Sequence, residues 1–175
     1  MSQDILDAER RYLANLLEAI QRCVYFLHQS ERKIDWPLAG SYLSQHKKDV
    51  ELYETLAAIN ERFAKLQDSL AAAMRHSSML MSEPSDSFLK VLAFFEKSGV
   101  IESTADWQRS RAARNLAAHD YETDYDEIAE HFNTLHQLSG MLYGTAKRLL
   151  TMCEQTLTLT PASDDFSNEF NAIVF

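Results

Sequence analysis

The stretch that decides the fold is "LANLLEAIQRCVYFL", residues 13–27. Its apolar side chains recur at steps of three and four residues, which places them along one face of an α-helix. The sequence therefore predicts a long helix with one solvent-exposed face, which begins near residue 3 and ends before Asp35-Trp36-Pro37. The apolar stripe consists of Leu13, Leu16, Leu17, Ile20, Val24 and Leu27.

Two more long helices show the same spacing. One carries apolar residues from Tyr53 to Met74, and the other runs from Asp124 through Cys153. Asp124 and the Glu127 that follows it resemble a capping box, which marks the start of a helix. Because the chain contains only four glycines and three prolines, the prediction is an all-α fold.

Two short helices are expected between these long ones. Ser85 or Asp86 is placed to cap a helix from Phe88 to Lys97, which Gly99 ends. Ser103-Thr104 opens the next helix, which should end near residue 119. About five helices with connections of ordinary length favour an antiparallel helical bundle.

The chain of 175 residues is most simply one domain, a bundle over residues 1–155 followed by a tail over 156–175. The tail has no lysine or arginine. Its sequence leaves open whether it docks on the bundle, forms a short extended piece or stays disordered.

Charge and cysteine content restrict the classes of function. With 26 acidic residues against 17 basic ones, the net charge is −9, so the protein is not a basic nucleic-acid coat and an anionic membrane would repel it. Cys23 and Cys153 are isolated, which fits a reducing compartment. The first thirty residues are too charged for a signal peptide or a membrane span. We therefore expect a cytoplasmic protein without a membrane partner.

No pattern predicts a metal or a cofactor. None of the six histidines follows a glutamate by three residues, the spacing that di-iron helical bundles use. His131 and His136 lie about 140° apart around a helix, which is poor geometry for one metal ion. Glycine-rich phosphate loops are absent as well.

A local positive patch interrupts this acidic chain between Trp107 and His119, where three arginines and no acid occur. These arginines are Arg109, Arg111 and Arg114. Cations near the end of a helix offset its dipole, which explains the first two. That explanation gives no reason for Arg114-Asn115, His119 and Tyr121 to come together. Trp107 itself is expected to anchor the core or an interface, with the stacking of a base as the alternative.

The residue types suit the cleavage of RNA without a metal. Histidine, with an unperturbed pKa near 6.5, can donate and accept protons at cellular pH. Arginine binds two phosphate oxygens at once and stays charged. On a regular helix, however, Arg114 and His119 point about 140° apart. They can cooperate if the helix loosens between them, or if they meet across two copies of the chain in a dimer groove.

"RNLAAHDY", residues 114–121, resembles the R-x4-H-x-Y motif of HEPN-domain proteins, in particular HepT-like toxins. These toxins are encoded with MntA, a minimal nucleotidyltransferase antitoxin. The resemblance extends over about residues 10–150, including "IQRCVYFL", "AKLQDSLAAAM" and "PSDSFLKVLAFFEKSGVIE". In this chain Ala112-Ala113 stand where family members often have Gly-Phe, and six acids lie between residues 120 and 130.

The resemblance implies a homodimeric, metal-independent endoribonuclease, the toxin of a type VII HEPN/MNT toxin–antitoxin system. Arg114 and His119 would be its catalytic pair and Asn115 an orienting partner, with Arg109 and Arg111 as candidate contacts to RNA. Tyr121 matches the tyrosine that the MntA-like antitoxin modifies with AMP, which would silence the toxin. Two alternatives stay open: a non-catalytic substrate-binding or regulatory subunit of a nucleotidyltransferase, and a plain structural bundle.

Overall fold

The computed structural model describes residues 2–118 and 124–174, and these residues form seven α-helices and no strand. The predicted all-α fold is confirmed, but the expected count of five helices is wrong because two further short helices occur. The helices are α1 (Gln3–Glu31), α2 (Gly40–Gln45), α3 (Val50–Leu80), α4 (Phe88–Lys97), α5 (Thr104–Ala118), α6 (Tyr125–Leu157) and α7 (Ser167–Ile173).

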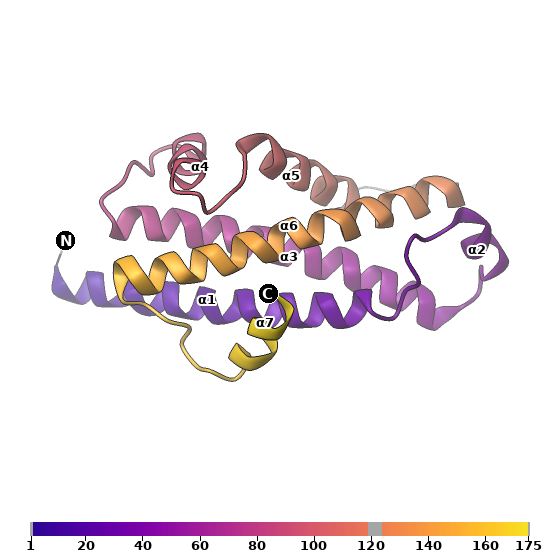
Figure 1. Cartoon of the computed structure of the whole chain (residues 1–175), viewed down its shortest axis with the longest axis horizontal. Helices are drawn as coiled ribbons and strands as arrows, with labels where there is room; N and C mark the ends of the chain where they lie inside the picture. Colours follow the sequence, from indigo (N-terminus) through magenta and orange to yellow (C-terminus); the bar gives the residue numbers. More distant parts are fainter. Residues whose placement is uncertain (1, 119–123, 175) are drawn as a thin grey trace.

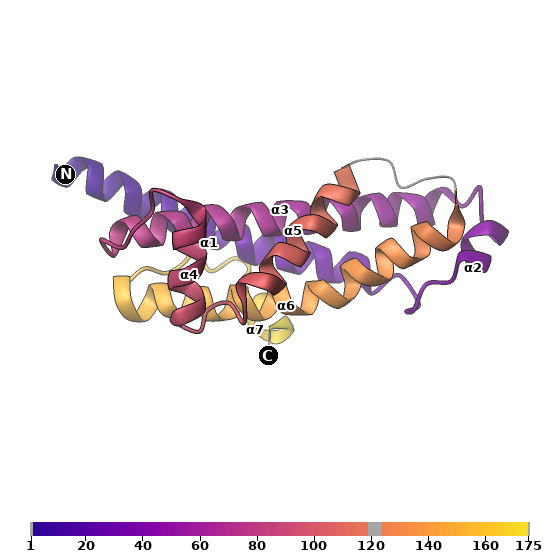
Figure 2. The same ribbon diagram turned by 90° about the horizontal axis from the view of Figure 1, so that it is seen from above.

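The three long helices α1, α3 and α6 lie along the long axis of the molecule (Figure 1). Helix α1 runs antiparallel to both α3 and α6, which share one direction because α4 and α5 carry the chain back between them. Figure 2 shows α4 crossing the long helices and α5 running obliquely over them. The bundle is therefore not a simple up-and-down arrangement, and the motif-bearing helix α5 lies on its outside.

The core forms where the apolar stripes of the long helices meet. Five of the six stripe residues of α1 are buried, and Leu16 packs at the edge of the core. In α3 the residues from Leu56 to Met74 that keep the helical spacing are buried, and Tyr53 is half-buried. The predicted apolar face of α6 is buried throughout. The helical periodicity of the sequence therefore identified the core correctly.

Capping residues mark the ends of the shorter elements, with one correction to the sequence prediction. The cap of α4 is Ser87, whose Oγ accepts a hydrogen bond from the backbone of Lys90, and not Ser85 or Asp86. Gly99 follows α4 with a φ of 76°, a left-handed conformation that glycine adopts without strain. Asp124 caps α6 as predicted, since its Oδ1 accepts a hydrogen bond from the backbone of Asp126.

Helix α2 is one of the two helices that the sequence analysis missed. It packs against the start of α6, with Leu43 buried. A Cβ on Gly40 would lie 2.8 Å from the Cα of Asp126, so this close approach of two backbones requires glycine. A helix of six residues is too short to show a periodic pattern, which explains why it was not predicted.

The described part of the tail, which ends at residue 174, docks on α1, a question that its sequence left open. The backbone N–H of Ala162 donates to the carbonyl of Ala14 at 3.0 Å, and Ser163 Oγ donates to Glu18 Oε1 at 2.7 Å. Helix α7 then lies against α1 (Figure 1) and buries Phe170. Helix α1 therefore provides the surface on which α7 and the segment before it pack.

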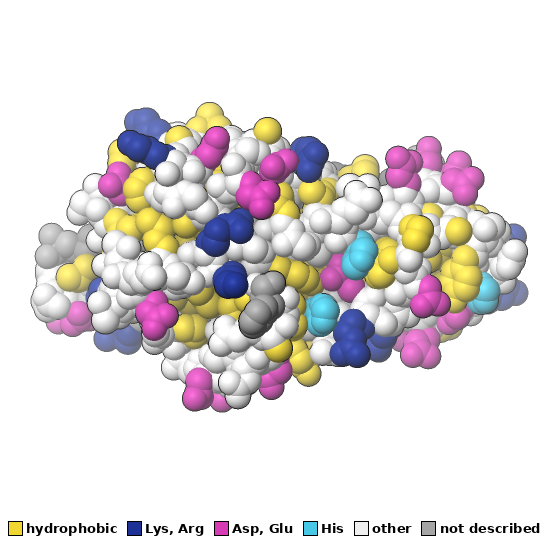
Figure 3. All heavy atoms as spheres, viewed as in Figure 1, with side chains coloured by type: hydrophobic (Ala, Val, Ile, Leu, Met, Phe, Trp, Pro, Cys, Tyr) yellow, Lys and Arg dark blue, Asp and Glu magenta, His cyan; other side chains and the backbone are white. Residues whose placement is uncertain are grey.

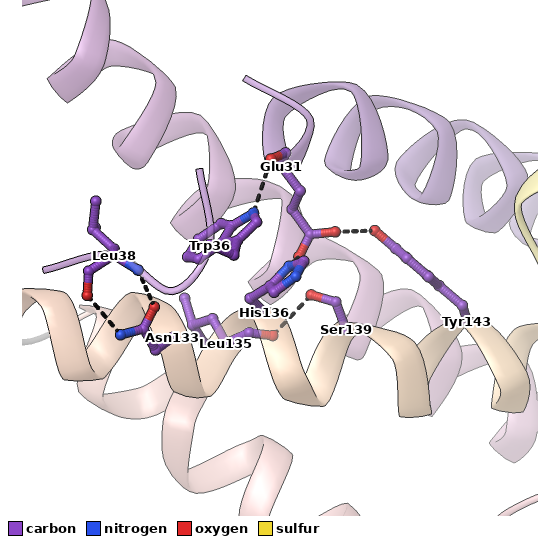
Figure 4. Close-up of polar contacts among 8 residues, drawn as sticks. All are labelled: Glu31, Trp36, Leu38, Asn133, Leu135, His136, Ser139 and Tyr143. Atoms are coloured by element: carbon purple, nitrogen blue, oxygen red, sulfur yellow. Dashed lines mark hydrogen bonds and ion pairs between the residues drawn. The ribbon is translucent and has the colours of Figure 1, made fainter. Parts of the chain in front are cut away.

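A buried carboxylate, Glu31, ties α1 to α6 and to the following loop (Figure 4). Its Oε2 accepts the hydroxyl hydrogen bond of Tyr143 at 2.8 Å, and its Oε1 lies 3.1 Å from Nδ1 of His136. The indole of Trp36 donates to the Glu31 backbone carbonyl at 2.9 Å and stacks on His136 with ring centroids 4.2 Å apart. Burial and the Glu31 carboxylate raise the pKa of Tyr143 well above its usual value, so this phenol stays a donor.

We expect Glu31→Ala to lower the free energy of unfolding by roughly 2 to 4 kcal/mol, because it leaves the buried hydroxyl of Tyr143 without an acceptor and removes the partner of His136. Urea denaturation followed by circular dichroism measures the change. Glu154→Ala, at an exposed position of α6, is the matched control and should change stability by less than about 0.5 kcal/mol. Equal effects of the two substitutions would contradict a special role for Glu31.

Candidate functional site

Helix α5 presents the described part of the R-x4-H-x-Y motif on the outer face of the bundle. Its inner face is anchored by Trp107, which is 1% exposed, and continues through the buried Ser110 and Ala113. Ser103 Oγ caps the helix by accepting from the backbone of Asp106. The interpretation of Trp107 as a core residue is confirmed, and its burial leaves no open ring face on which a base could stack.

Arg114 and Asn115, which are neighbours in the sequence, are joined by a side-chain hydrogen bond. Arg114 Nη1 donates to Asn115 Oδ1 at 3.2 Å, and Nη2 donates to Asp68 Oδ2 of α3 at 2.8 Å. The Arg114 side chain is 34% exposed and that of Asp68 is 57% exposed. The guanidinium group is therefore oriented toward α3 and is still accessible to solvent. His119 and Tyr121 lie outside the described residues.

An open pocket of about 440 Å³ lies between α3, α4 and α5 beside Arg114. Arg111 also lines it, together with Arg75 of α3 and Phe88 of α4. Asp68 is the one carboxylate among the lining residues, and it is already paired with Arg114. Of the residues that the structure describes, those lining this pocket therefore give it an excess of positive charge.

Arg75 is a site residue that the sequence analysis missed. It lies on α3, far from the motif in sequence, and its exposed position on an amphipathic helix resembles that of any solvated charge. Its guanidinium carbon lies 5.5 Å from the centroid of the Phe88 ring, a cation–π contact. Because only the docking of α5 and α4 on α3 brings Arg75 beside Arg111, no local signal could have identified it.

Arg109 lies apart from Arg111 and Arg114, in a second pocket of about 790 Å³ between α5 and α6. Its Nη2 is paired with Asp106 Oδ1 at 3.2 Å. Burial lowers the pKa of His131, which also lines this pocket, so its imidazole is neutral at pH 7 and adds no positive charge. The acids lining the pocket are Glu102, Asp106, Glu127 and Glu130. These carboxylates make the second pocket a poor place for RNA phosphates.

Acidic side chains also gather over the start of α6, at the upper right of Figure 3. Asp124, Asp126, Glu127 and Glu130 are all exposed there. An RNA strand bound along α5 therefore meets repulsion on the α6 side and attraction on the α3 side. Charge alone favours the pocket between α3, α4 and α5.

Two further features of the described residues bear on the sequence predictions. No three histidine, cysteine, aspartate or glutamate side chains in the described ranges come together as a metal site would require. No helix within those ranges is long and apolar enough to cross a membrane.

Comparisons with known proteins found no match for this chain: no family model, no curated protein and no solved structure matches it. The functional interpretation therefore rests on the residues of the motif, their resemblance to HEPN proteins and the geometry around Arg114.

We expect Arg114→Ala to lower the free energy of unfolding by only about 0.2 to 1 kcal/mol, because its ion pair with Asp68 is exposed to solvent on both sides. Thermal and urea unfolding of the purified variant beside the wild type measure the change. A loss above roughly 2 kcal/mol would show that Arg114 mainly holds α5 on the bundle, and its substitution would then be unsuitable as a test of catalysis.

Proposed function

We propose that this chain is the toxin of a type VII HEPN/MNT toxin–antitoxin system, a metal-independent endoribonuclease that acts on RNA in the cytoplasm. The observation that carries the proposal is the position of the motif arginine. In a protein with a net charge of −9, Arg114 lines a pocket together with two further arginines, Arg75 and Arg111, and Asp68 is the one carboxylate among the lining residues. The resemblance of residues 114–121 to the R-x4-H-x-Y motif supplies the reaction class.

In the proposed reaction, the 2′-hydroxyl of RNA attacks the adjacent phosphorus and the bond from phosphorus to the 5′-oxygen breaks. A base takes the proton of the 2′-hydroxyl, and an acid gives a proton to the leaving 5′-oxygen. The products are a 2′,3′-cyclic phosphate and a 5′-hydroxyl. His119 is the proposed group for proton transfer, a contribution typically worth about 10²- to 10⁴-fold in rate.

Arg114 is proposed to bind the scissile phosphate and to stabilise the negative charge that develops on its oxygens. Asn115 supports this role, because its side-chain oxygen accepts from Arg114 Nη1 and limits how the guanidinium can turn. Because Arg114 and His119 are separated by about 140° on a regular helix, we propose that a homodimer brings the motif of one copy beside that of its partner.

We propose that modification of Tyr121 controls the activity of the toxin. An MntA-like nucleotidyltransferase antitoxin would transfer AMP from a nucleotide to the tyrosine oxygen and release pyrophosphate. The added phosphate would bring negative charge to the motif and so oppose the binding of the substrate phosphate. Tyr121→Phe is then expected to keep ribonuclease activity and to lose its sensitivity to the antitoxin.

A second candidate function has one observation in its favour. Arg114 is already paired with Asp68 at 2.8 Å, so a phosphate must compete with a carboxylate of the same chain. A non-catalytic subunit that presents Tyr121 to a nucleotidyltransferase has no need of a free arginine. Such a subunit forms a stable complex with that enzyme without arresting growth, whereas the proposed toxin arrests growth when it is expressed alone.

Cleavage of a defined RNA by purified protein in EDTA tests the proposal. We expect the wild type to leave 2′,3′-cyclic phosphate ends and Arg114→Ala and His119→Ala each to lower the rate by about 10²-fold or more. Mass spectrometry of the products identifies the ends, and intact mass shows that the protein carries no AMP.

Arg32→Ala is the matched control, because Arg32 is exposed at the far end of α1 from the pocket. Its activity should equal that of the wild type. Absence of cleavage by unmodified, folded wild-type protein would reject the ribonuclease. Cleavage that survives in both motif variants would indicate a contaminating nuclease.

A further inference from the structure

The pocket between α3, α4 and α5 contains positive charge that the motif chemistry does not use. The motif supplies Arg114, whereas Arg75 and Arg111 line the same pocket and belong to no motif. Neither of these two arginines pairs with a carboxylate of the described residues, and both are exposed. Two guanidinium groups that line one pocket of an acidic protein, with no carboxylate partner in the described part of the chain, favour an anionic ligand.

Arg75 is held in place by an aromatic ring instead of by an acid. Its guanidinium carbon lies 5.5 Å from the centroid of the Phe88 ring, and Phe88 in turn packs on Trp107 with ring centroids 6.3 Å apart. A guanidinium group ordered over a ring keeps its full charge. It also offers its outer face as a surface on which an unpaired base can stack.

One buried donor in the pocket wall lacks a partner. The indole Nε1 of Trp107, which lines the pocket, is buried and has no hydrogen-bond acceptor among the described residues. Buried donors in folded proteins are nearly always paired. Because this nitrogen is itself inaccessible, the contacts available to an anionic ligand in the pocket are those of the two arginines.

We propose that Arg75, Arg111 and Phe88 form a second RNA-binding site, which holds the nucleotide next to the phosphate bound by Arg114. In this site the two arginines bind the neighbouring phosphate, and the base stacks on the guanidinium of Arg75. The inference rests on the proposed ribonuclease function and adds a substrate class to it, because stacking on Arg75 requires an unpaired base. The volume of about 440 Å³ is within the range of ligand pockets in proteins.

Fluorescence anisotropy with a labelled single-stranded RNA of mixed sequence tests this site in the full-length His119→Ala protein, which cannot consume the probe under the proposed mechanism. We expect Arg75→Gln and Arg111→Gln each to weaken binding about three- to tenfold and to lower the slope of affinity against salt by about one. Arg32→Gln is the matched control and should bind as the parent does. Phe88→Leu should weaken binding less than Arg75→Gln, because it keeps the charge and loses the ordering ring.

Two further probes identify the ligand. The same RNA annealed to its complement should bind less tightly than the single strand, and AMP should compete only weakly. If Arg75→Gln binds the single strand as Arg32→Gln does, or if no RNA binds, the second site is rejected. If Arg75→Gln loses AMP binding and keeps RNA binding, the pocket belongs to a mononucleotide and the inference is also overturned.

Cleavage assays separate the failure of this inference from that of the proposed function. If cleavage requires Arg114 and His119 but is unchanged in Arg75→Gln, the ribonuclease function is supported and the second RNA-binding site is rejected. If the protein has no cleavage activity but binds single-stranded RNA in a way that depends on Arg75, the second RNA-binding site is supported and the ribonuclease function is rejected.

Discussion

The burial of the apolar faces of α1 and α3 against each other is the interaction on which the rest of this structure depends. Each helix is long enough to form a continuous stripe, and neither can bury that stripe alone. The apolar face of helix α6 packs against these two helices and completes the core. The smaller helices lie on the outside of this three-helix unit. Glu31 adds a fixed polar connection between α1 and α6 at one end.

The direction of α6 explains the position of the candidate site. Because α3 and α6 run the same way, the chain must return between them, and it does so through α4 and α5. The face of α5 that carries Trp107 packs on the bundle, which turns Arg111 and Arg114 toward α3 and leaves Arg109 beside α6. One helix therefore divides its positive charge between a basic pocket and an acidic one.

Much of the fold could be predicted from the sequence because helical periodicity and capping are local properties. The long helices, the cap at Asp124 and the stop at Gly99 follow from neighbouring residues. Helices α2 and α7 could not be predicted because they have only six and seven residues, which is less than two turns of the helical repeat of apolar residues. Competing serines near residue 85 offer similar caps, so Ser87 was missed.

The sequence by itself determined the helical class, the core faces, the net charge and the motif around Arg114. It also determined which residues share one face of α5, since that depends on helix geometry alone. Only the tertiary structure decided that Asp68 pairs with Arg114 and that Arg75 lines the same pocket. The physical reason is that side chains on different helices meet only after the helices dock, and docking depends on the burial of apolar surface across the whole chain.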